Sequence, residues 1–319
     1  MFLKVFLLLA GFALLIKGAD FLVLGSSALA RRFKISELII GLTIVAFGTS
    51  TPELIVSIVA AAKGLNDVAI GNVVGSNIFN LLFILGISAL ILPLTVQRST
   101  IIKEIPYSIV AAILLLILAN DHLYTEKRAN VITFIDGIIL FAFFLFFMYY
   151  IFRNMKNDNP DIAVDKKPYG IWKILLLIIG GLAGLVLGGR ISVINAVAIA
   201  HELGISERII GLTIIAAGTS LPELATSAVA AYRRNSDIAV GNVVGSNIFN
   251  ILFVLSASAF VNPLPYKLSF NTDITVLIGA TMLLLFFTYT GKKAVIDRRE
   301  GFLLMLGYIG YTVFLVLAG

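Results

Sequence analysis

The sequence predicts an all-α, polytopic membrane protein with ten transmembrane helices arranged as two inverted-topology five-helix repeats. Three observations predict it. The 319-residue chain is 59% hydrophobic and only 13% charged, whereas soluble proteins carry about 25% charged residues. Apolar stretches close to the ~20 residues that cross a bilayer recur along the whole chain. Finally, two motifs occur twice, both at a spacing of 170 residues.

The apolar stretches give ten expected spans in chain order. They are 3–30, 37–62, 68–92, 101–119, 131–152, 172–200, 208–231, 238–261, 271–290 and 301–318. Because the first stretch reappears near the start of the second half, we expect it to stay in the membrane and not to be cleaved as a signal peptide.

The most polar stretch divides the chain into two halves. It reads RNMKNDNPDIAVDKKPYG at 153–170, and its charges and prolines are typical of a linker. We therefore expect a first five-helix repeat at 1–152, a cytoplasmic linker at 153–170 and a second repeat at 171–319. Since five is odd, the second repeat must enter the membrane upside down. Secondary transporters of this kind bind ions near the midplane, between the repeats.

Lys and Arg residues concentrate on the side of the spans opposite the N-terminus and give a formal net charge of +6. Basic loops face the cytoplasm in membrane proteins, so the charge indicates topology and predicts no nucleic-acid partner. Both termini are then expected outside, in a multi-pass protein of the plasma membrane. The expected partners are the lipid bilayer and transported ions. Nothing in the sequence fixes the oligomeric state, and a monomer suffices.

The first duplicated motif places a carboxylate beside a proline inside an apolar span. It reads GLTIVAFGTSTPEL at 41–54 and GLTIIAAGTSLPEL at 211–224. The carboxylates are Glu53 and Glu223. Such a segment could be a proline kink in a packed helix, with a neutral or paired glutamate. Because the candidate oxygen ligands (the Gly–Thr carbonyls, the Thr and Ser hydroxyls and the glutamate) are duplicated, an ion site is the favoured interpretation, as it is for carboxylates inside membranes generally.

The residues around Glu53 offer the oxygens that a cation needs. Proline removes one backbone N–H and collides with the carbonyl four residues back, so Pro52 frees the Gly48 carbonyl and disturbs that of Thr49. In hydrocarbon such carbonyls need a partner. Hard cations bind carboxylates, carbonyls and hydroxyls. The Ser50 hydroxyl completes a set that the second repeat copies.

The second motif, GNVVGSNIFN, is identical at 71–80 and 241–250. Asn72, Ser76 and Asn80 are spaced by four, so they share one stripe of a helix. Amides and hydroxyls supply neutral oxygens, which suit a site that must also release its ion. For Asn72, a contact that only holds helices together fits equally well. Two carboxylates in one cavity would be neutralised by one Ca²⁺, by Na⁺ ions or by protons, so binding should weaken as the pH falls.

In these motifs the chain resembles the cation/Ca²⁺ exchanger superfamily, and most closely its prokaryotic Na⁺/Ca²⁺ exchangers. The resemblance covers nearly the whole chain. It implies ten helices with the second, third, seventh and eighth as the core, across which the first and sixth slide. It also implies an ion site formed by Glu53, Glu223, Thr49, Thr219, Ser50, Ser220, Ser76, Ser246, Asn80, Asn250, Ala46 and Ala216.

Within that implied site, Glu53 and Glu223 bind Ca²⁺ with help from the two threonine carbonyls, and Asn80 and Asn250 lie at the middle. Each flanking Na⁺ site is implied to use one repeat. The oxygens are those of Ser50, Ser76 and the Ala46 carbonyl, and of Ser220, Ser246 and the Ala216 carbonyl. The K⁺-dependent branch carries Asp in place of Asn250, so K⁺ co-transport is not expected.

We therefore expect a secondary-active antiporter that exchanges Ca²⁺ for Na⁺ by alternating access. A H⁺/Ca²⁺ exchanger with the same carboxylates is the first alternative, and a cation channel is the second. We expect no enzyme, because no nucleophile–base pair, phosphate loop or His/Cys metal cluster is present. No cofactor is expected beyond the transported ions. The chain has no cysteine, which excludes disulfides and thiolate metal sites.

Two charged residues in the first span also need an explanation. Lys17 and Asp20 lie three residues apart, which favours an ion pair between them on one helix face. In the second repeat Arg190 occupies the position of Asp20, and we expect its long side chain to reach toward the membrane surface.

Overall fold

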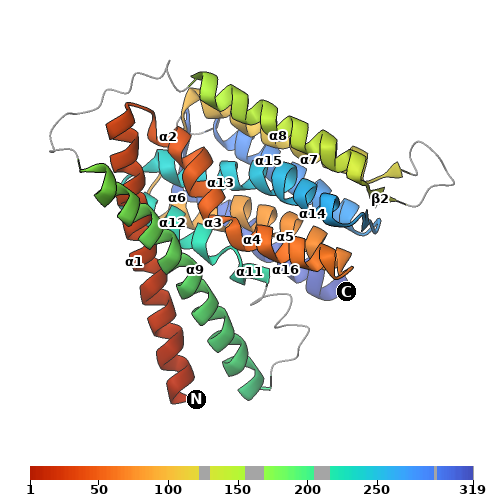
Figure 1. The fold of residues 1–319 in the computed structure, drawn as a ribbon, viewed down its shortest axis with the longest axis horizontal. Coiled ribbons are helices and arrows are strands. Elements are labelled where there is room, and N and C mark those ends of the chain that lie inside the picture. The colour runs from red at the N-terminus through yellow and green to blue at the C-terminus, as the bar shows by residue number, and fades with distance from the viewer. Residues whose placement is uncertain (122–129, 155–168, 205–215, 291–292, 319) are drawn as a thin grey trace.

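The computed structural model describes residues 1–121, 130–154, 169–204, 216–290 and 293–318, and they are mostly helical (Figure 1). The first half contains α1 (Phe2–Phe33), α2 (Glu37–Ile40), η1 (Gly41–Val45), α3 (Ala46–Thr49), α4 (Thr51–Ala62), α5 (Asn66–Ile78), η2 (Phe79–Ile84), α6 (Leu85–Ile91), η3 (Thr100–Glu104), α7 (Ile105–Leu118) and α8 (Phe134–Asn154). The second half contains α9 (Ile171–Glu202), α11 (Ala216–Gly218), α12 (Leu221–Tyr232), α13 (Ser236–Phe249), η6 (Asn250–Val254), α14 (Leu255–Val261), α15 (Phe270–Phe287) and α16 (Arg298–Ala318). The η segments are π-helical.

In the described part of the chain, eight helices are long and apolar enough to cross a membrane, and a bent pair, Glu37–Thr49 with Thr51–Ala62, makes a ninth. These nine match nine of the expected spans to within a few residues. The expected span 208–231 is represented by α11 and α12 and begins within 205–215, outside the described residues. Most of the expected linker 153–170 also lies outside them.

Within the described ranges, four two-residue strands accompany the helices. They are β1 (Leu94–Thr95), β2 (Val131–Ile132), β3 (Leu264–Pro265) and β4 (Val295–Ile296). Strand β1 pairs antiparallel with β4, and β2 pairs antiparallel with β3. Each pair joins the first half of the chain to the second.

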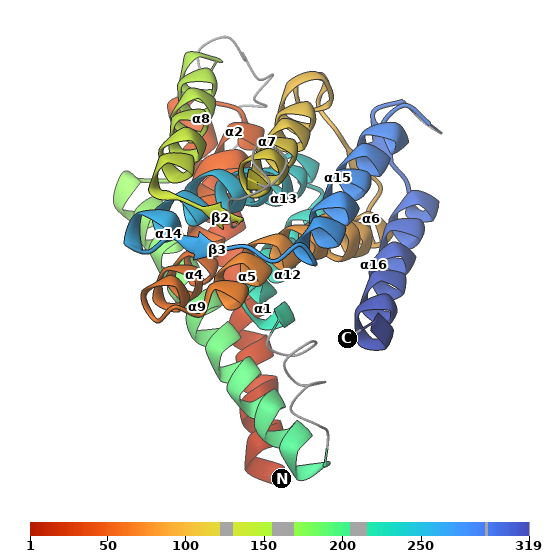
Figure 2. The same cartoon turned by 90° about the vertical axis from the view of Figure 1, so that its right-hand side faces the viewer.

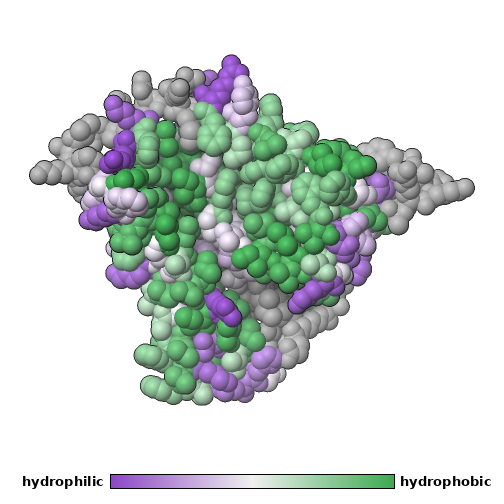
Figure 3. Space-filling model, in the orientation of Figure 1, coloured by the Kyte–Doolittle hydropathy of each residue, from purple (hydrophilic) through white to green (hydrophobic). Residues whose placement is uncertain are grey.

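The helices that carry the asparagine motif form the centre of the molecule. In the span Ser236–Val261, 94% of the apolar window is buried, and in Asn66–Ile91 the share is 72%. In Arg298–Leu317 it is only 17%. The face drawn in Figure 3 is accordingly mostly hydrophobic, with hydrophilic residues gathered toward its edges. This distribution is expected where the outer helices face lipid and the polar motifs are enclosed.

Helices α1 and α9 lie side by side and project from the rest of the molecule (Figures 1 and 2). They run antiparallel, since Gly11 faces Gly188 and Gly18 faces Gly181. Close approach of two backbones through glycine is a common packing mode in membranes. Because α1 and α9 open the two halves, their opposite directions are what inversion of the repeats requires for this pair.

In the second copy of the asparagine motif, two glycines allow close packing of helices. A Cβ on Gly241 would lie 2.9 Å from the Leu38 carbonyl oxygen, and one on Gly245 would lie 2.6 Å from that of Leu42. In these places α13 therefore packs against α2 and η1 without intervening side chains.

Candidate cation-binding site

The two glutamates are placed by a helix break at the proline motif. The chain bends by 46° between Glu37–Thr49 and Thr51–Ala62. Pro52 stands in the first turn of α4, where its missing N–H costs no helical hydrogen bond. Glu53 follows in that first turn, and Glu223 has the same place in α12. The helix dipole favours a negative charge at this end. Both side chains are fully buried.

Each carboxylate is held by a serine from the other half of the chain. The Ser220 hydroxyl donates to Glu53 Oε1 at 2.9 Å, and the Ser50 hydroxyl donates to Glu223 Oε1 at 2.7 Å. Ser76 adds a longer contact of 3.5 Å to Glu53 Oε1. The structure therefore brings the two proline motifs together into one site.

Four asparagines form a second layer across the same junction. Asn77 Nδ2 donates to the Asn247 carbonyl at 3.1 Å, and Asn247 Nδ2 donates back to the Asn77 carbonyl at 3.2 Å. The amide nitrogen of Asn80 donates to Asn247 Oδ1 at 3.0 Å. Asn250 makes the equivalent bond to Asn77 Oδ1, also at 3.0 Å. The nitrogens of Asn80 and Asn250 are thus occupied, and their oxygens are not.

Four buried side-chain oxygens of this cluster lack a hydrogen-bond partner among the residues that the structure describes. They are Glu53 Oε2, Glu223 Oε2, Asn80 Oδ1 and Asn250 Oδ1. An unsatisfied buried acceptor costs free energy, so it needs a partner. Carboxylate and amide oxygens are what hard cations bind. The donor set therefore fits Ca²⁺ or Na⁺ as a transported substrate.

Asn72 has no such free oxygen. Its Nδ2 donates to the Glu53 carbonyl at 3.2 Å and to Ser57 Oγ at 2.9 Å, and its Oδ1 accepts from Thr219 Oγ1 at 3.3 Å. Asn242 makes the equivalent contacts in the second half. All polar atoms of these two amides have protein partners, so the contacts favour the helix-joining role. They hold the glutamate backbone against the opposite half.

Among the remaining predicted residues, some contacts cross between the halves and others stay within one half. The Ser246 hydroxyl donates to the Ala46 carbonyl at 3.4 Å, whereas Ser76 contacts Glu53. Thr49 ends α3 and also donates to the Ala46 carbonyl, at 3.2 Å. Ala216 begins α11. The implied grouping of the Na⁺ ligands by repeat stays a prediction. Inversion of the second half places its hydroxyls beside the carbonyls and carboxylates of the first.

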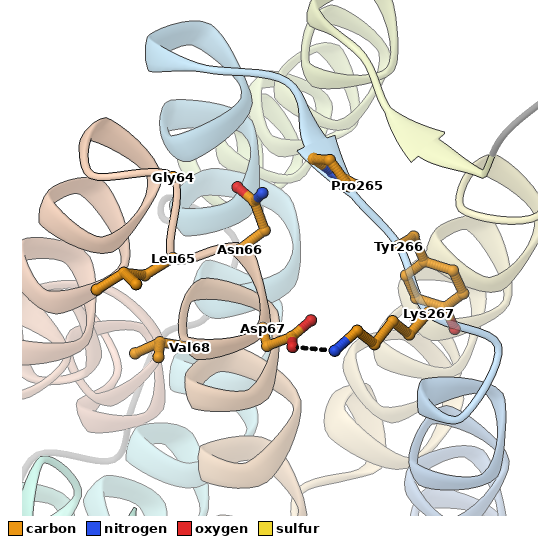
Figure 4. Close-up of a pocket in the computed structure, with 8 residues that line it drawn as sticks. All are labelled: Gly64, Leu65, Asn66, Asp67, Val68, Pro265, Tyr266 and Lys267. Atoms are coloured by element: carbon orange, nitrogen blue, oxygen red, sulfur yellow. Dashed lines mark hydrogen bonds and ion pairs between the residues drawn. The ribbon is translucent and has the colours of Figure 1, made fainter.

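Two other kinds of site could hold a cation in the described residues: a cluster of metal-binding side chains, or a pocket at the surface. No group of three His, Cys, Asp or Glu residues occurs in the described ranges. A pocket of about 430 Å³ lies between residues 64–68 and 265–267, where Asp67 pairs with Lys267 at 2.5 Å (Figure 4). None of the predicted site residues lines it.

The sequence did not single out Asn77 or Asn247 as functional. The decapeptide is identical in both copies, so its asparagines differ only in helical position. The spacing of three between Asn77 and Asn80 indicated a shared face, but the partner of each amide lies in the other half. The signal that could have found them is the repeat itself, because inverted repeats are related by a twofold axis. A residue close to that axis contacts the same residue of the other copy, as Asn77 contacts Asn247.

Comparisons with known proteins agree with the geometry. The family model described as sodium/calcium exchanger protein matches residues 3–153 and 173–317. CaxA of Alkalimonas amylolytica is 41% identical over 96% of this chain and 97% of its own. The sodium/calcium exchanger MaX1 of Methanosarcina acetivorans is 33% identical over 97% of each chain. A structure of the sodium-calcium exchanger NCX_Mj soaked with Na⁺ and Ca²⁺ is 34% identical, superposes with a TM-score of 0.82 and covers 98% of both chains.

Proposed function

This chain belongs to the sodium/calcium exchanger protein family, whose members are Ca²⁺/cation antiporters, and on that premise we propose that it exchanges Ca²⁺ for Na⁺ by alternating access. One observation carries the proposal. Two buried carboxylates from opposite halves each accept a hydrogen bond from a serine of the other half, and each retains an oxygen without a partner, as do the buried amides of Asn80 and Asn250.

In this proposal Glu53 and Glu223 are the shared Ca²⁺ ligands, assisted by the Thr49 and Thr219 carbonyls. Two carboxylates match the charge of one Ca²⁺. The same carboxylates can instead hold Na⁺ ions, because Na⁺ also binds hard oxygen ligands. The two ions would then compete for the same oxygens, which is what exchange requires. Asn80 and Asn250 complete the centre of the site.

The cross-repeat contacts support two flanking Na⁺ sites with donors from both halves. One would combine the Ala46 carbonyl, Ser50 and Ser246 with Glu223. The other would combine Ser76 and Ser220 with Glu53 and the Ala216 carbonyl. Each Na⁺ would then touch one of the two carboxylates that bind Ca²⁺, so Na⁺ occupancy and Ca²⁺ occupancy exclude one another.

The assignment of Glu53 and Glu223 as Ca²⁺ ligands can be tested by mutation with a matched control. Glu53→Gln or Glu223→Gln removes one negative charge from the pair and should abolish Na⁺-gradient-driven ⁴⁵Ca²⁺ uptake into proteoliposomes. Glu104→Gln changes another buried glutamate, which is not part of the cluster. Its Oε1 accepts a hydrogen bond of 2.5 Å from the Tyr150 hydroxyl. Glu104→Gln should retain uptake. Full uptake by Glu53→Gln or Glu223→Gln would refute the assignment.

The coupling ion requires a separate assay. Proteoliposomes are loaded with Ca²⁺ and given either an inward Na⁺ gradient without a pH gradient, or a pH gradient without Na⁺. We expect Ca²⁺ release only with Na⁺. Release driven by the pH gradient alone would identify a H⁺/Ca²⁺ exchanger that uses the same carboxylates. Ca²⁺ flux that needs neither counter-ion would contradict exchange altogether.

A further inference from the structure

Helices α1 and α9 differ in what they touch, although they occupy equivalent places in the two halves. Each is 32 residues long. Helix α1 packs along α12 of the second half. No comparable packing joins α9 to α4 in the described part of the first half. Among the described residues the conformation is therefore asymmetric, with the closer packing on the α1–α12 side.

A polar cluster accompanies the α1–α12 contact, and we name it the α1 latch. It consists of Asp20, Ser27, Glu37, Arg233 and Asn235. Arg233 Nε donates to Asp20 Oδ1 at 2.6 Å, and the two side chains form an ion pair. Asn235 Nδ2 donates to Ser27 Oγ at 3.0 Å and to Glu37 Oε2 at 2.5 Å. The spacing had predicted that Lys17 pairs with Asp20, and this prediction is wrong. In the structure the partner of Asp20 is Arg233.

The other half of the chain cannot build this latch. A shift of 170 residues places Arg190 at the position of Asp20, and Lys63 at the position of Arg233. Leu65 stands in the place of Asn235 and Val197 in that of Ser27. At these four positions one anion, one cation and two polar groups are replaced by two cations and two apolar groups, whereas the fifth latch residue, Glu37, corresponds to another glutamate, Glu207. Among the described residues, Lys63 and Arg190 form no hydrogen bond or ion pair.

Inverted repeats make the contacts of the opposite state predictable. Alternating access moves one bundle against the other around a fixed site, and each half can adopt the conformation that the other now holds. A contact between residues i and j is then replaced by one between i + 170 and j − 170. Contact of α9 with α4 would therefore bring Arg190 beside Lys63, while α1 leaves α12 and the latch opens.

We propose that the α1 latch biases this exchanger toward the conformation in which α1 packs on α12. The equivalent contact between α9 and α4 would have no such latch. The inference rests on the alternating-access exchange proposed above. Attraction between Asp20 and Arg233 stabilises the observed state, and repulsion between Lys63 and Arg190 disfavours the opposite one. Unlike charges lower the energy of the state in which they meet, and like charges raise it. The attraction and the repulsion therefore both favour the observed state.

A second ion pair provides an internal control. Asp67 pairs with Lys267, and the equivalent residues Asp237 and Gln97 form a hydrogen bond of 2.7 Å. Both copies of this contact are present at once, so neither distinguishes the two states. Asp67→Asn should therefore break an exposed ion pair without changing the balance between conformations.

The experiment measures two distances in the purified, reconstituted protein. Because the chain contains no cysteine, pairs of spin labels can be attached to introduced cysteines and their separation measured by pulsed electron paramagnetic resonance. One pair is placed at Phe21 and Tyr232, which are exposed beside the latch. The matched pair is at Ile191 and Ala62, the same positions shifted by one repeat.

We expect Asp20→Asn to lengthen the first distance and shorten the second. The ratio of the two populations should change by about twofold to fivefold, which is what a partly exposed ion pair contributes. Lys63→Asp, which would create attraction to Arg190, should shift the ratio in the same direction. Exchanging the charges (Asp20→Arg with Arg233→Asp) should restore the parent ratio, and Asp67→Asn should leave it unchanged.

The outcomes separate the latch from the transport function. If Na⁺ or Ca²⁺ changes the distances in the parent protein but Asp20→Asn and Lys63→Asp do not, the latch does not set the balance. The latch proposal would also be overturned if each label pair gave one distance that is the same in all variants. If the parent exchanges no Ca²⁺ yet Asp20→Asn still shifts both distances, the proposed function fails and the latch stands.

Discussion

The orientation of two amide groups decides whether the centre of the site attracts or repels a cation. An asparagine side chain can present either its oxygen or its NH₂ group, and only the oxygen is a ligand. In this structure Asn77 and Asn247 accept the amide hydrogens of Asn250 and Asn80. Their own amide nitrogens are fixed on each other's backbone carbonyls. The amide nitrogens of Asn80 and Asn250 are therefore held, and their oxygens are left without a hydrogen-bond partner among the described residues.

This geometry predicts that Asn77 acts through Asn250 as a positioning residue. Asn77→Ala removes the acceptor for the Asn250 amide, so that amide can rotate, and Ca²⁺ affinity should fall about tenfold, in line with the loss of one buried hydrogen bond. Isothermal titration calorimetry measures it. Asn262→Ala is the control, because Asn262 donates to the Ala61 carbonyl away from the site. An unchanged affinity in Asn77→Ala, with a reduced one in Asn250→Ala, would contradict the positioning role.

The buried carboxylates also predict how binding responds to pH. Only an ionised carboxylate accepts a cation, so metal binding displaces any proton that Glu53 or Glu223 carries. Ca²⁺ affinity should therefore decrease as the pH is lowered and reach a plateau as it is raised. Proton release into a weakly buffered solution on Ca²⁺ addition reports the same linkage. An affinity that rises on acidification would rule out ionised carboxylates as the ligands.

At the scale of elements, the α1–α9 pair depends on the absence of side chains between two backbones. A Cβ on Gly18 would lie 2.7 Å from the Leu185 nitrogen and 2.8 Å from the Gly181 oxygen. Backbone atoms cannot move aside as flexible side chains can, so the helices would have to separate.

Gly18→Ala should therefore destabilise the protein by about 1–3 kcal/mol, the usual cost of overpacking. Thermal unfolding in detergent measures the loss. Gly180→Ala is the matched control on α9, because a Cβ there meets no atom within 4 Å, and it should leave the melting temperature unchanged or slightly raised. Equal melting temperatures for the two variants would show that the helices are not in close contact at Gly18.

The sequence predicted elements better than partners. Helix positions follow from apolar length, and the break before α4 follows from Pro52, because both are local properties. The π-helical turns that begin beside Asn80 and at Asn250 leave no comparable local signal. The bond between Glu104 and Tyr150 was not foreseen either, because the two residues lie 46 positions apart in different expected spans. Contacts between residues 170 positions apart depend on how the halves fold together.

For the whole molecule, the distribution of basic residues predicts the orientation in the membrane. The loop residue Leu65 lies on the predicted outer face, and Arg32 on the basic face; both are exposed. Single cysteines at these positions should react differently with a membrane-impermeant maleimide on intact cells. Leu65→Cys should be labelled, and Arg32→Cys should be labelled only after the membrane is opened. The reverse pattern would place both termini inside.

The reciprocal bond between Asn77 and Asn247 has a consequence for the origin of the chain. Equivalent residues that contact one another lie on a twofold axis, as they do at the interface of a symmetric dimer. A single five-helix protein that inserted into the membrane in both orientations could form this same contact with its own upside-down copy. Fusion of the two genes would then free each copy to change alone, and Asp20 against Arg190 is one place where the descendants no longer agree.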